Sequence, residues 1–137
     1  MTEPMSPPEV PPADEITAGW WDATREHRLV VQGCEACGTV QHPPRAVCTG
    51  CGEGGRLVWR DDAGTGVVDS FTVVHRAPRK DLAVPYVIAR VRLDSGVLLL
   101  TRLEGADDQA WRIDDRVRVA WVDLADGRAL PVFTPAD

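Results

Sequence analysis

Short apolar runs separated by turn-forming residues dominate the chain after its cysteine-rich part. The runs cover residues 56–60, 66–75, 86–93, 97–103, 116–122 and 130–133. In one of them, Val117, Val119 and Trp121 alternate with polar or small residues, and this period of two is typical of a half-buried strand. Residues 94–96 (Asp-Ser-Gly) join two runs closely enough to form a hairpin. Five or six short strands in a stretch of about 80 residues favour a small β-barrel.

The pattern ahead of the cysteines predicts one helix over residues 13–27, which Asp14 is suited to cap. The residues that share a face at helical spacing are Ile16, Trp20, Ala23, Thr24 and His27. Trp20 and Trp21 are adjacent, and two neighbouring indoles on so short a helix cannot both point at one core. Either Trp20 covers the neighbouring module and Trp21 is half exposed, or the helix docks on a partner.

These patterns divide the chain into four parts. Residues 1–12 hold five of the eleven prolines and predict a flexible tail, or an arm that becomes ordered on a partner. The helix occupies residues 13–27, and the cysteine module occupies residues 28–55, with a short strand leading into it. The barrel occupies residues 56–137.

Composition and charge limit the classes of function. Hydrophobic residues make up 44% of the 137 residues and charged residues 26%, as in soluble globular domains. A net charge of −6 argues against nucleic-acid binding, because such binding depends on neutralising phosphates. Apolar runs are too short to span a bilayer, and the N-terminus lacks the basic start and apolar core of a secretory signal. We therefore expect a cytoplasmic protein without membrane contact.

Two Cys-x-x-Cys pairs, ten residues apart, carry the strongest chemical signal. They are Cys34 with Cys37 and Cys48 with Cys51. Each pair can turn two thiolates toward one ion, and two pairs complete a tetrahedral site. Gly38 and Gly52 follow the second cysteine of each pair and permit the positive φ of such a turn. The pattern predicts one structural Zn²⁺ per chain, with zinc favoured over iron; a redox dithiol lacks its usual strand–helix context.

Little in the sequence points to catalysis, and we predict no catalytic residue. His42 lies between the cysteine pairs, where a fifth ligand is redundant, so we expect it to pack in the loop. One basic segment in the acidic chain contains His75, Arg76, Arg79 and Lys80. This segment predicts an exposed loop, either merely solvated or able to clamp ligand phosphates or an acidic partner.

The motifs together resemble the zinc-ribbon and OB-fold proteins of the "domain of unknown function 35" (DUF35) family. The shared features are the helix with two tryptophans, Cys34-x-x-Cys37-Gly38, and the step Pro43-Pro44-Arg45 before the second cysteine pair. His42 stands where the family has an aromatic residue. Residues 85–87, Gly96 and residues 131–133 are also similar. The resemblance covers the chain from about residue 13 and implies a mainly β fold: an N-terminal helix, a rubredoxin-like zinc ribbon and a C-terminal OB-fold barrel.

The resemblance also implies a function. Family members are not usually enzymes by themselves; they associate with thiolase-fold enzymes, including aldolases that cleave steroid side-chain acyl-CoAs, or accompany acyl-CoA hydratases. We therefore expect a non-catalytic subunit that helps shape the acyl-CoA site of a thiolase-fold partner, by analogy in a two-plus-two heterotetramer.

Within this hypothesis, several residues receive provisional roles. Arg45 and the basic segment are candidates to contact acyl-CoA phosphates or the partner, although Arg45 is equally suited to a salt bridge that locks ribbon to barrel. Large side chains at Trp20, Trp21 and Trp59 could anchor an interface, whereas Trp111 and Trp121 are expected to serve the barrel.

Two alternatives remain open. A free-standing acyl-CoA-binding protein would bind the same ligand tightly without a partner. A single-stranded nucleic-acid-binding module would also suit a zinc ribbon and an OB-fold, but the net charge and the two Phe and one Tyr are a poor match for a basic stacking platform.

Overall fold

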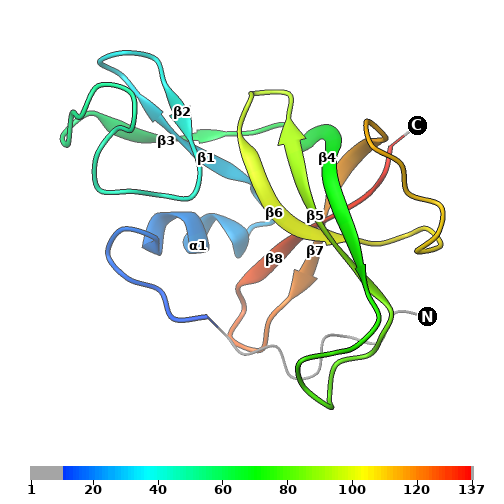
Figure 1. Cartoon of the computed structure of the whole chain (residues 1–137). Helices are drawn as coiled ribbons and strands as arrows, with labels where there is room; N and C mark the ends of the chain where they lie inside the picture. Colours follow the sequence, from blue (N-terminus) through cyan, green and yellow to red (C-terminus); the bar gives the residue numbers. More distant parts are fainter. Residues whose placement is uncertain (1–10, 137) are drawn as a thin grey trace.

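A computed structural model describes residues 11–136, and it confirms the mainly β fold class with one short helix (Figure 1). The helix is α1 (Ala18–Thr24). The ribbon sheet holds β1 (Val30–Cys34), β2 (Val40–Gln41) and β3 (Leu57–Asp61). The barrel holds β4 (Thr65–Val74), β5 (Tyr86–Leu93), β6 (Leu98–Leu103), β7 (Arg116–Asp123) and β8 (Ala129–Pro135). The predicted tail lies almost entirely outside the described residues. Within residues 11–136, no helix has the length and apolar character that a membrane span requires.

The barrel closes in the order β4-β5-β6-β8-β7, the five-stranded arrangement of an OB-fold. β4 and β5 pair over most of their length, with a β-bulge between Val68 and Ser70. β6 and β8 run parallel and pair only at Leu103 and Phe133. Val68, Val91 and Phe133 are fully buried, and burial of each such side chain contributes about 1.5–3 kcal/mol. The apolar alternation along these strands therefore builds the barrel core, as the sequence predicts.

The ribbon sheet has the order β2-β1-β3, and this corrects one strand assignment. Sequence pattern places residues 56–60 with the barrel, but β3 pairs antiparallel with β1, from Val30 opposite Asp61 to Cys34 opposite Leu57. β3 itself is half-exposed, whereas every residue of β1 is buried. An alternation pattern identifies a strand but not its neighbour, because pairing is decided by contacts between distant parts of the chain.

The helix is shorter than predicted, and its ends explain why. Thr17, not Asp14, is its N-cap residue, although the Asp14 carboxylate accepts hydrogen bonds from the N–H groups of Ile16 (3.0 Å) and Thr17 (2.8 Å) in the preceding turn. After the helix, His27 adopts φ +54°, a conformation that ends a right-handed helix. The predicted extra turns are therefore non-helical turns at both ends of α1.

Both adjacent tryptophans are buried, so the expectation that Trp21 is half exposed is wrong, whereas Trp20 covers the neighbouring module as one of the two interpretations expected. Trp20 is 8% exposed and Trp21 9%, and their rings meet edge to face at 4.8 Å. Trp20 also packs against His42 of the ribbon at 5.8 Å, while Trp21 lies under the Arg128 guanidinium at 4.5 Å. The helix contacts both modules, β1 on one side and β8 on the other, and this gives each indole its own neighbour.

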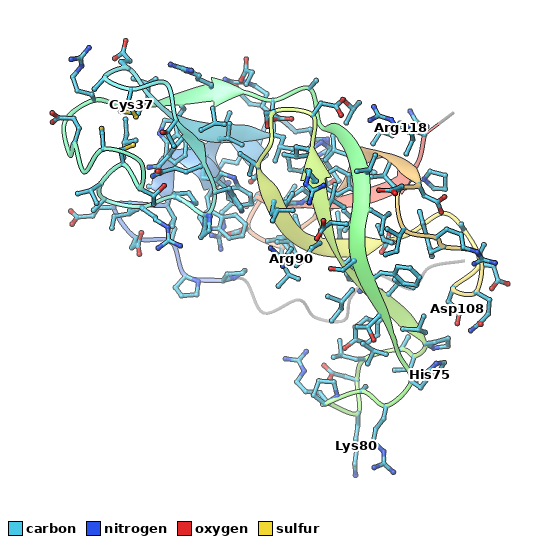
Figure 2. All side chains as sticks on the ribbon, turned by 45° about the horizontal axis from the view of Figure 1, so that its top comes forward. Cys37, His75, Lys80, Arg90, Asp108 and Arg118 are labelled. Atoms are coloured by element: carbon cyan, nitrogen blue, oxygen red, sulfur yellow. The ribbon has the colours of Figure 1, made fainter. Side chains whose placement is uncertain are left out.

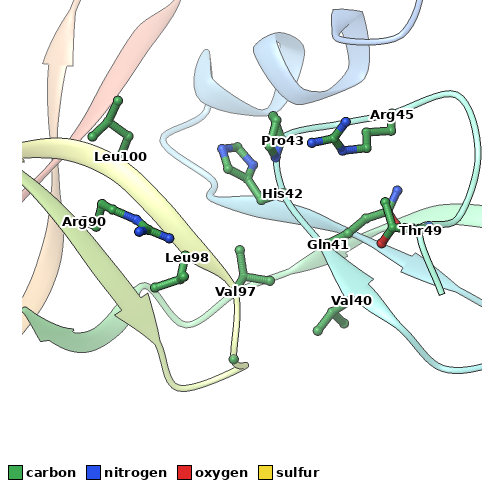
Figure 3. Close-up of a pocket in the computed structure, with 11 residues that line it drawn as sticks. Val40, Gln41, His42, Pro43, Arg45, Thr49, Arg90, Val97, Leu98 and Leu100 are labelled. Atoms are coloured by element: carbon green, nitrogen blue, oxygen red, sulfur yellow. Dashed lines mark hydrogen bonds between the residues drawn. The ribbon is translucent and has the colours of Figure 1, made fainter. Parts of the chain in front are cut away.

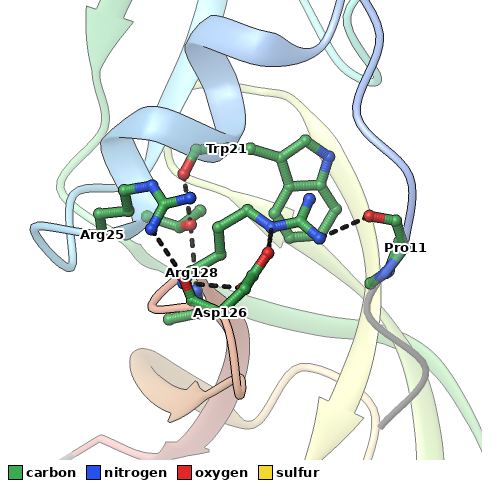
Figure 4. Close-up of polar contacts among 7 residues, drawn as sticks. Pro11, Trp21, Arg25, Asp126 and Arg128 are labelled. Carbon is green, nitrogen blue, oxygen red and sulfur yellow. Dashed lines mark hydrogen bonds and ion pairs between the residues drawn. The ribbon is translucent and has the colours of Figure 1, made fainter.

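A cluster of polar contacts fastens α1 to the turn between β7 and β8 (Figure 4). Arg128 donates through Nε to Asp126 Oδ2 (2.6 Å) and through Nη2 to the Pro11 carbonyl (2.6 Å). Arg25 donates to the Asp126 carbonyl (2.8 Å), and the Thr24 hydroxyl accepts from the Ala129 N–H (3.1 Å). Arg128 is buried, so its carboxylate partner and the indole face beneath it offset the cost of burying the charge.

A carboxylate ties three barrel strands together at the end of the β5–β6 hairpin. Asp94 accepts hydrogen bonds from Arg116 Nη1 (2.9 Å) and Nη2 (3.2 Å) and from the Thr65 hydroxyl (2.6 Å). These donors, Arg116 first and Thr65 second, hold the pKa of Asp94 at about 2, below its ordinary value of 3.8.

Replacing Gly66 with Ala should weaken the barrel. A Cβ at this position would overlap the backbone carbonyl of Arg92 on the paired strand β5, and a backbone cannot move aside as a side-chain tip can. We expect a loss of about 1–3 kcal/mol in the free energy of unfolding, measured by urea denaturation. Gly54→Ala is the control, because a Cβ there makes only ordinary contacts; equal stability of the two variants would show that β4 and β5 have room for a side chain at this crossing.

The Asp94 contacts predict a specific pH dependence. Because the pKa of Asp94 is lower in the folded chain, its stabilising contribution is complete above about pH 4 and is lost as the pH falls toward 2. Asp94→Asn should therefore show a smaller decrease in Tm between pH 4 and pH 2 than the unmodified chain. Thermal unfolding followed by circular dichroism measures this, with Asp22→Asn, an exposed carboxylate on α1, as the control that should keep the original slope.

Candidate metal centre and the cleft beside it

The four cysteine sulfurs form one compact group where the two knuckle turns meet. Cys34 ends β1, Cys37 lies in the turn after it, and the other pair lies in the loop between β2 and β3. All four Sγ atoms lie within 4.8 Å of one another; the Sγ–Sγ distance is 3.8 Å from Cys34 to Cys51 and 3.6 Å from Cys37 to Cys48. A tetrahedral ion with metal–sulfur bonds of about 2.3 Å places its sulfurs about 3.8 Å apart. The residues therefore fit a four-thiolate metal site.

The glycine after each knuckle has the predicted conformation. Gly38 has φ +83° and Gly52 φ +80°, and their N–H groups donate to the carbonyls of Cys34 (2.8 Å) and Cys48 (2.9 Å). A Cβ at either position would meet open space. The demand for glycine is therefore conformational, because L side chains rarely adopt positive φ.

The electrostatics of the four cysteine side chains favour a bound cation. Backbone N–H groups of Cys51 and Gly50 outweigh burial and lower the pKa of Cys48 to about 6. For Cys51, the Glu53 N–H lowers the pKa, but burial and the three neighbouring sulfurs outweigh it and raise the pKa to about 12. Four thiolates at these distances repel one another, so a bound divalent cation is needed for all four to be charged together.

His42 has the packing role that the sequence predicts. It is not part of the sulfur group and lies against the Trp20 ring. Burial lowers the pKa of His42 to about 4, which keeps the imidazole neutral at physiological pH and suits it to this apolar contact.

A buried pair of glutamines, which the sequence pattern did not reveal, supports the loop between the knuckles. Gln41 Nε2 donates to Gln32 Oε1 (2.8 Å). Gln32 then bonds the backbone of Arg45 at both N–H (2.8 Å) and carbonyl (3.0 Å), and Gln41 Oε1 accepts from the Thr49 N–H (2.9 Å). The available signal was Gln32 itself, a polar residue within an otherwise apolar strand.

Arg45 lies in a cleft of about 600 Å³ between ribbon and barrel, with Arg90 on the opposite side (Figure 3). The two guanidinium groups extend toward this space from different domains. The salt bridge considered for Arg45 is absent within residues 11–136: its side chain is without an ion pair there. Sequence reasoning missed Arg90, because an arginine within a strand pattern gives no sign of which cleft it faces.

The basic segment does not join this cleft. His75, Arg76 and Lys80 are exposed at the tip of the β4–β5 hairpin, at the far end from the cysteines (Figure 2). Arg79 pairs with Asp81 at 3.0 Å. Arg45 and this segment therefore cannot contact one phosphate group together in this structure.

The remaining tryptophans divide between the barrel and the surface. Trp111 is buried in the core, and Trp121 is half-buried and stacks on His27 at 5.4 Å. Trp59 is 39% exposed and covers Gly19 of α1 so closely that a Cβ there would overlap the indole. A hollow of about 370 Å³ with charged residues at its rim adjoins it. Of the three tryptophans predicted to meet a partner, Trp59 offers the most surface, and that role stays a prediction.

Comparisons with known proteins match almost the whole chain. Family profiles match residues 21–57, described as "ChsH2, rubredoxin-like zinc ribbon domain", and residues 59–122, described as "ChsH2, C-terminal OB-fold domain". A solved structure described as "Ltp2-ChsH2(DUF35) aldolase" has a chain 37% identical, with a TM-score of 0.85, over 93% of this chain and 99% of that one.

Three curated proteins are also similar to this chain. A "Probable enoyl-CoA hydratase alpha subunit" of Thermomonospora curvata is 38% identical over 92% of this chain, and a "3-oxo-4,17-pregnadiene-20-carboxyl-CoA hydratase alpha subunit" of Mycobacterium tuberculosis is 36% identical over 85%. The chain spans only 39% and 37% of these two proteins. A "DUF35 domain-containing scaffold protein" of Methanothermobacter thermautotrophicus is 28% identical over 78% of this chain and 81% of that protein.

Replacing Cys34 with Ser should release the metal and unfold the ribbon. A module of this size has too small a core to fold alone, and a closed metal site contributes folding free energy directly. We expect one metal ion per chain for the unmodified protein and for His42→Phe, and none for Cys34→Ser, by elemental mass spectrometry. A Cys34→Ser chain that keeps its metal and its full Tm would contradict the four-cysteine site.

Proposed function

Because this chain belongs to the DUF35 family, we propose that it is a non-catalytic subunit of an enzyme complex that acts on acyl-CoA, with a thiolase-fold enzyme as its partner. The observation that carries the proposal is the match, at 37% identity and over 99% of its length, to a chain in a structure described as an aldolase of two named components. Relatives with the names hydratase alpha subunit and scaffold protein support a role within a complex.

The metal in this proposal is zinc, and its role is structural. Four cysteine thiolates arranged tetrahedrally around one ion fill the coordination sphere of that ion. No coordination position is then left for a substrate. The ion would hold the two knuckles together and thereby fix the loop that carries Arg45. Its chemical contribution is to neutralise the thiolates and to stabilise the ribbon.

The partner surface in this proposal includes Trp59 on the outer strand of the ribbon sheet. Within residues 11–136, β3 pairs with β1 alone. Trp59 adjoins a hollow whose lining includes Asp22, Arg25, Glu26 and Arg28. An aromatic anchor surrounded by charged residues is the usual composition of a protein–protein interface.

Affinity purification of the tagged chain from its own cells, with mass spectrometry of the eluate, tests the proposal. We expect a thiolase-fold enzyme in near-stoichiometric amount, and its acyl-CoA activity should fall when the chain is omitted from a reconstituted mixture. Trp59→Glu should lower partner recovery by about tenfold, which corresponds to a loss of about 1.4 kcal/mol of binding free energy at an aromatic anchor.

Ile113→Glu is the matched control, because Ile113 is also an exposed apolar residue (53%) but lies in the loop between β6 and β7. Equal recovery with both variants would remove Trp59 from the interface. A chain that elutes alone would contradict the subunit proposal and leave two readings, a free-standing acyl-CoA-binding protein and a nucleic-acid-binding module, which titrations with acyl-CoA and with single-stranded DNA separate.

A further inference from the structure

One edge of the ribbon sheet has main-chain groups that no strand within residues 11–136 pairs with, on the outer side of β3. The Arg56 carbonyl accepts a hydrogen bond from the Glu35 N–H (2.9 Å), and the Asp62 N–H donates to the Leu29 carbonyl (2.8 Å). Both bonds fit the register in which β3 pairs with β1. Every second residue of β3 therefore bonds β1, and the residues between turn their N–H and carbonyl groups away from it. The residues that face the unpaired edge in this way are Leu57, Trp59 and Asp61.

β3 lacks the features that usually protect a free edge from pairing with another strand. It contains neither proline nor lysine, and it pairs with β1 at five consecutive positions without a bulge. Its charged side chains lean toward β1: Arg60 lies over Gly33 of that strand, and Asp61 pairs with Arg28, two residues before β1, at 2.7 Å. The opposite edge of the sheet, β2, is only two residues long. β3 is therefore the edge of this sheet that can accept a further strand.

The hollow of about 370 Å³ beside this edge indicates the charge of the strand that it suits. Trp59 lines it together with the charged residues Asp22, Arg25, Glu26 and Arg28. Arg28 pairs with Glu26 (3.0 Å) and with Asp61 (2.7 Å), whereas Asp22 is exposed and has no ion pair within the described part of the chain. An unpaired carboxylate next to an exposed indole suits a lysine or arginine side chain, which both groups attract.

We propose that an extended segment of the partner enzyme adds to β3 as a fourth strand of the ribbon sheet and places a basic side chain in the hollow beside Trp59 and Asp22. The outward N–H and carbonyl groups of β3 hold the backbone of that segment, and the hollow selects its side chain, the usual division of roles in strand addition. The inference rests on the proposed subunit function and names how the partner is bound.

Amide hydrogen exchange of the full, metal-loaded chain, with and without the captured thiolase-fold enzyme, tests the added strand. Mass spectrometry with residue-resolved fragmentation distinguishes neighbouring amides. The amides of Leu57, Trp59 and Asp61 should exchange rapidly in the free chain and at least about tenfold more slowly in the complex. Val58 and Arg60 bond β1 and should exchange slowly in both states, which makes them the internal control.

A proline variant tests the same edge through partner recovery. Asp61→Pro removes one outward N–H and leaves the bonds to β1 in place, because edge strands accept proline where the N–H faces outward. Recovery of the enzyme should fall about tenfold, since one main-chain hydrogen bond is lost and the proline ring obstructs the added strand. Asp61→Ala is the matched control: it loses the same carboxylate but keeps the N–H, and should recover the enzyme as the unmodified chain does. Tm and metal content verify that both variants fold.

The basic side chain is tested by a second pair of variants. Asp22→Asn should lower recovery of the enzyme about threefold, the effect of losing one exposed ion pair. Asp114→Asn is the matched control, because Asp114 is also exposed but lies in the loop between β6 and β7. Equal recovery with the two variants would overturn the assignment of a basic side chain to the hollow.

The outcomes distinguish this inference from the proposed function. If the enzyme is captured but the outward amides of β3 still exchange rapidly, or if Asp61→Pro and Asp61→Ala recover it equally, strand addition is overturned while the subunit proposal stands. Protection of these amides that rises with the concentration of the chain alone would assign the edge to a second copy and overturn the inference. Failure to capture any thiolase-fold enzyme overturns the subunit proposal, and this inference with it.

Discussion

The burial of Trp20 and Trp21 between the ribbon and the barrel is the interaction on which the remaining structure depends. Neither module covers both faces of α1 alone: Trp20 packs toward His42 of the ribbon, and Trp21 packs under Arg128 of the barrel. Two buried indoles remove a large apolar area from water. The helix therefore acts as the joint between the two modules.

The cysteine group extends this constraint to the functional surface. A ribbon of fewer than about 40 residues cannot build a core of its own, so the ion stabilises the knuckles, and the knuckles position the loop between them. Gln32 and Gln41 then bind the backbone of that loop. The backbone from which Arg45 projects is consequently held in place.

The barrel contributes the other wall of the cleft that Arg45 lines. Arg90 and Leu100 come from neighbouring strands that pair with each other, so their spacing is fixed by the sheet.

Local sequence determined much of this protein. The metal ligands, the glycines after each knuckle, the hairpin at residues 94–96 and most strand positions followed from spacing and alternation, because such features depend on neighbours within a few residues. Tertiary structure alone decided that β3 joins the ribbon, that both adjacent tryptophans are buried, and that Arg45 faces Arg90 and not the basic segment. Each of these depends on contacts between residues far apart in the chain, and a periodic pattern carries no information about which distant surface a side chain will meet.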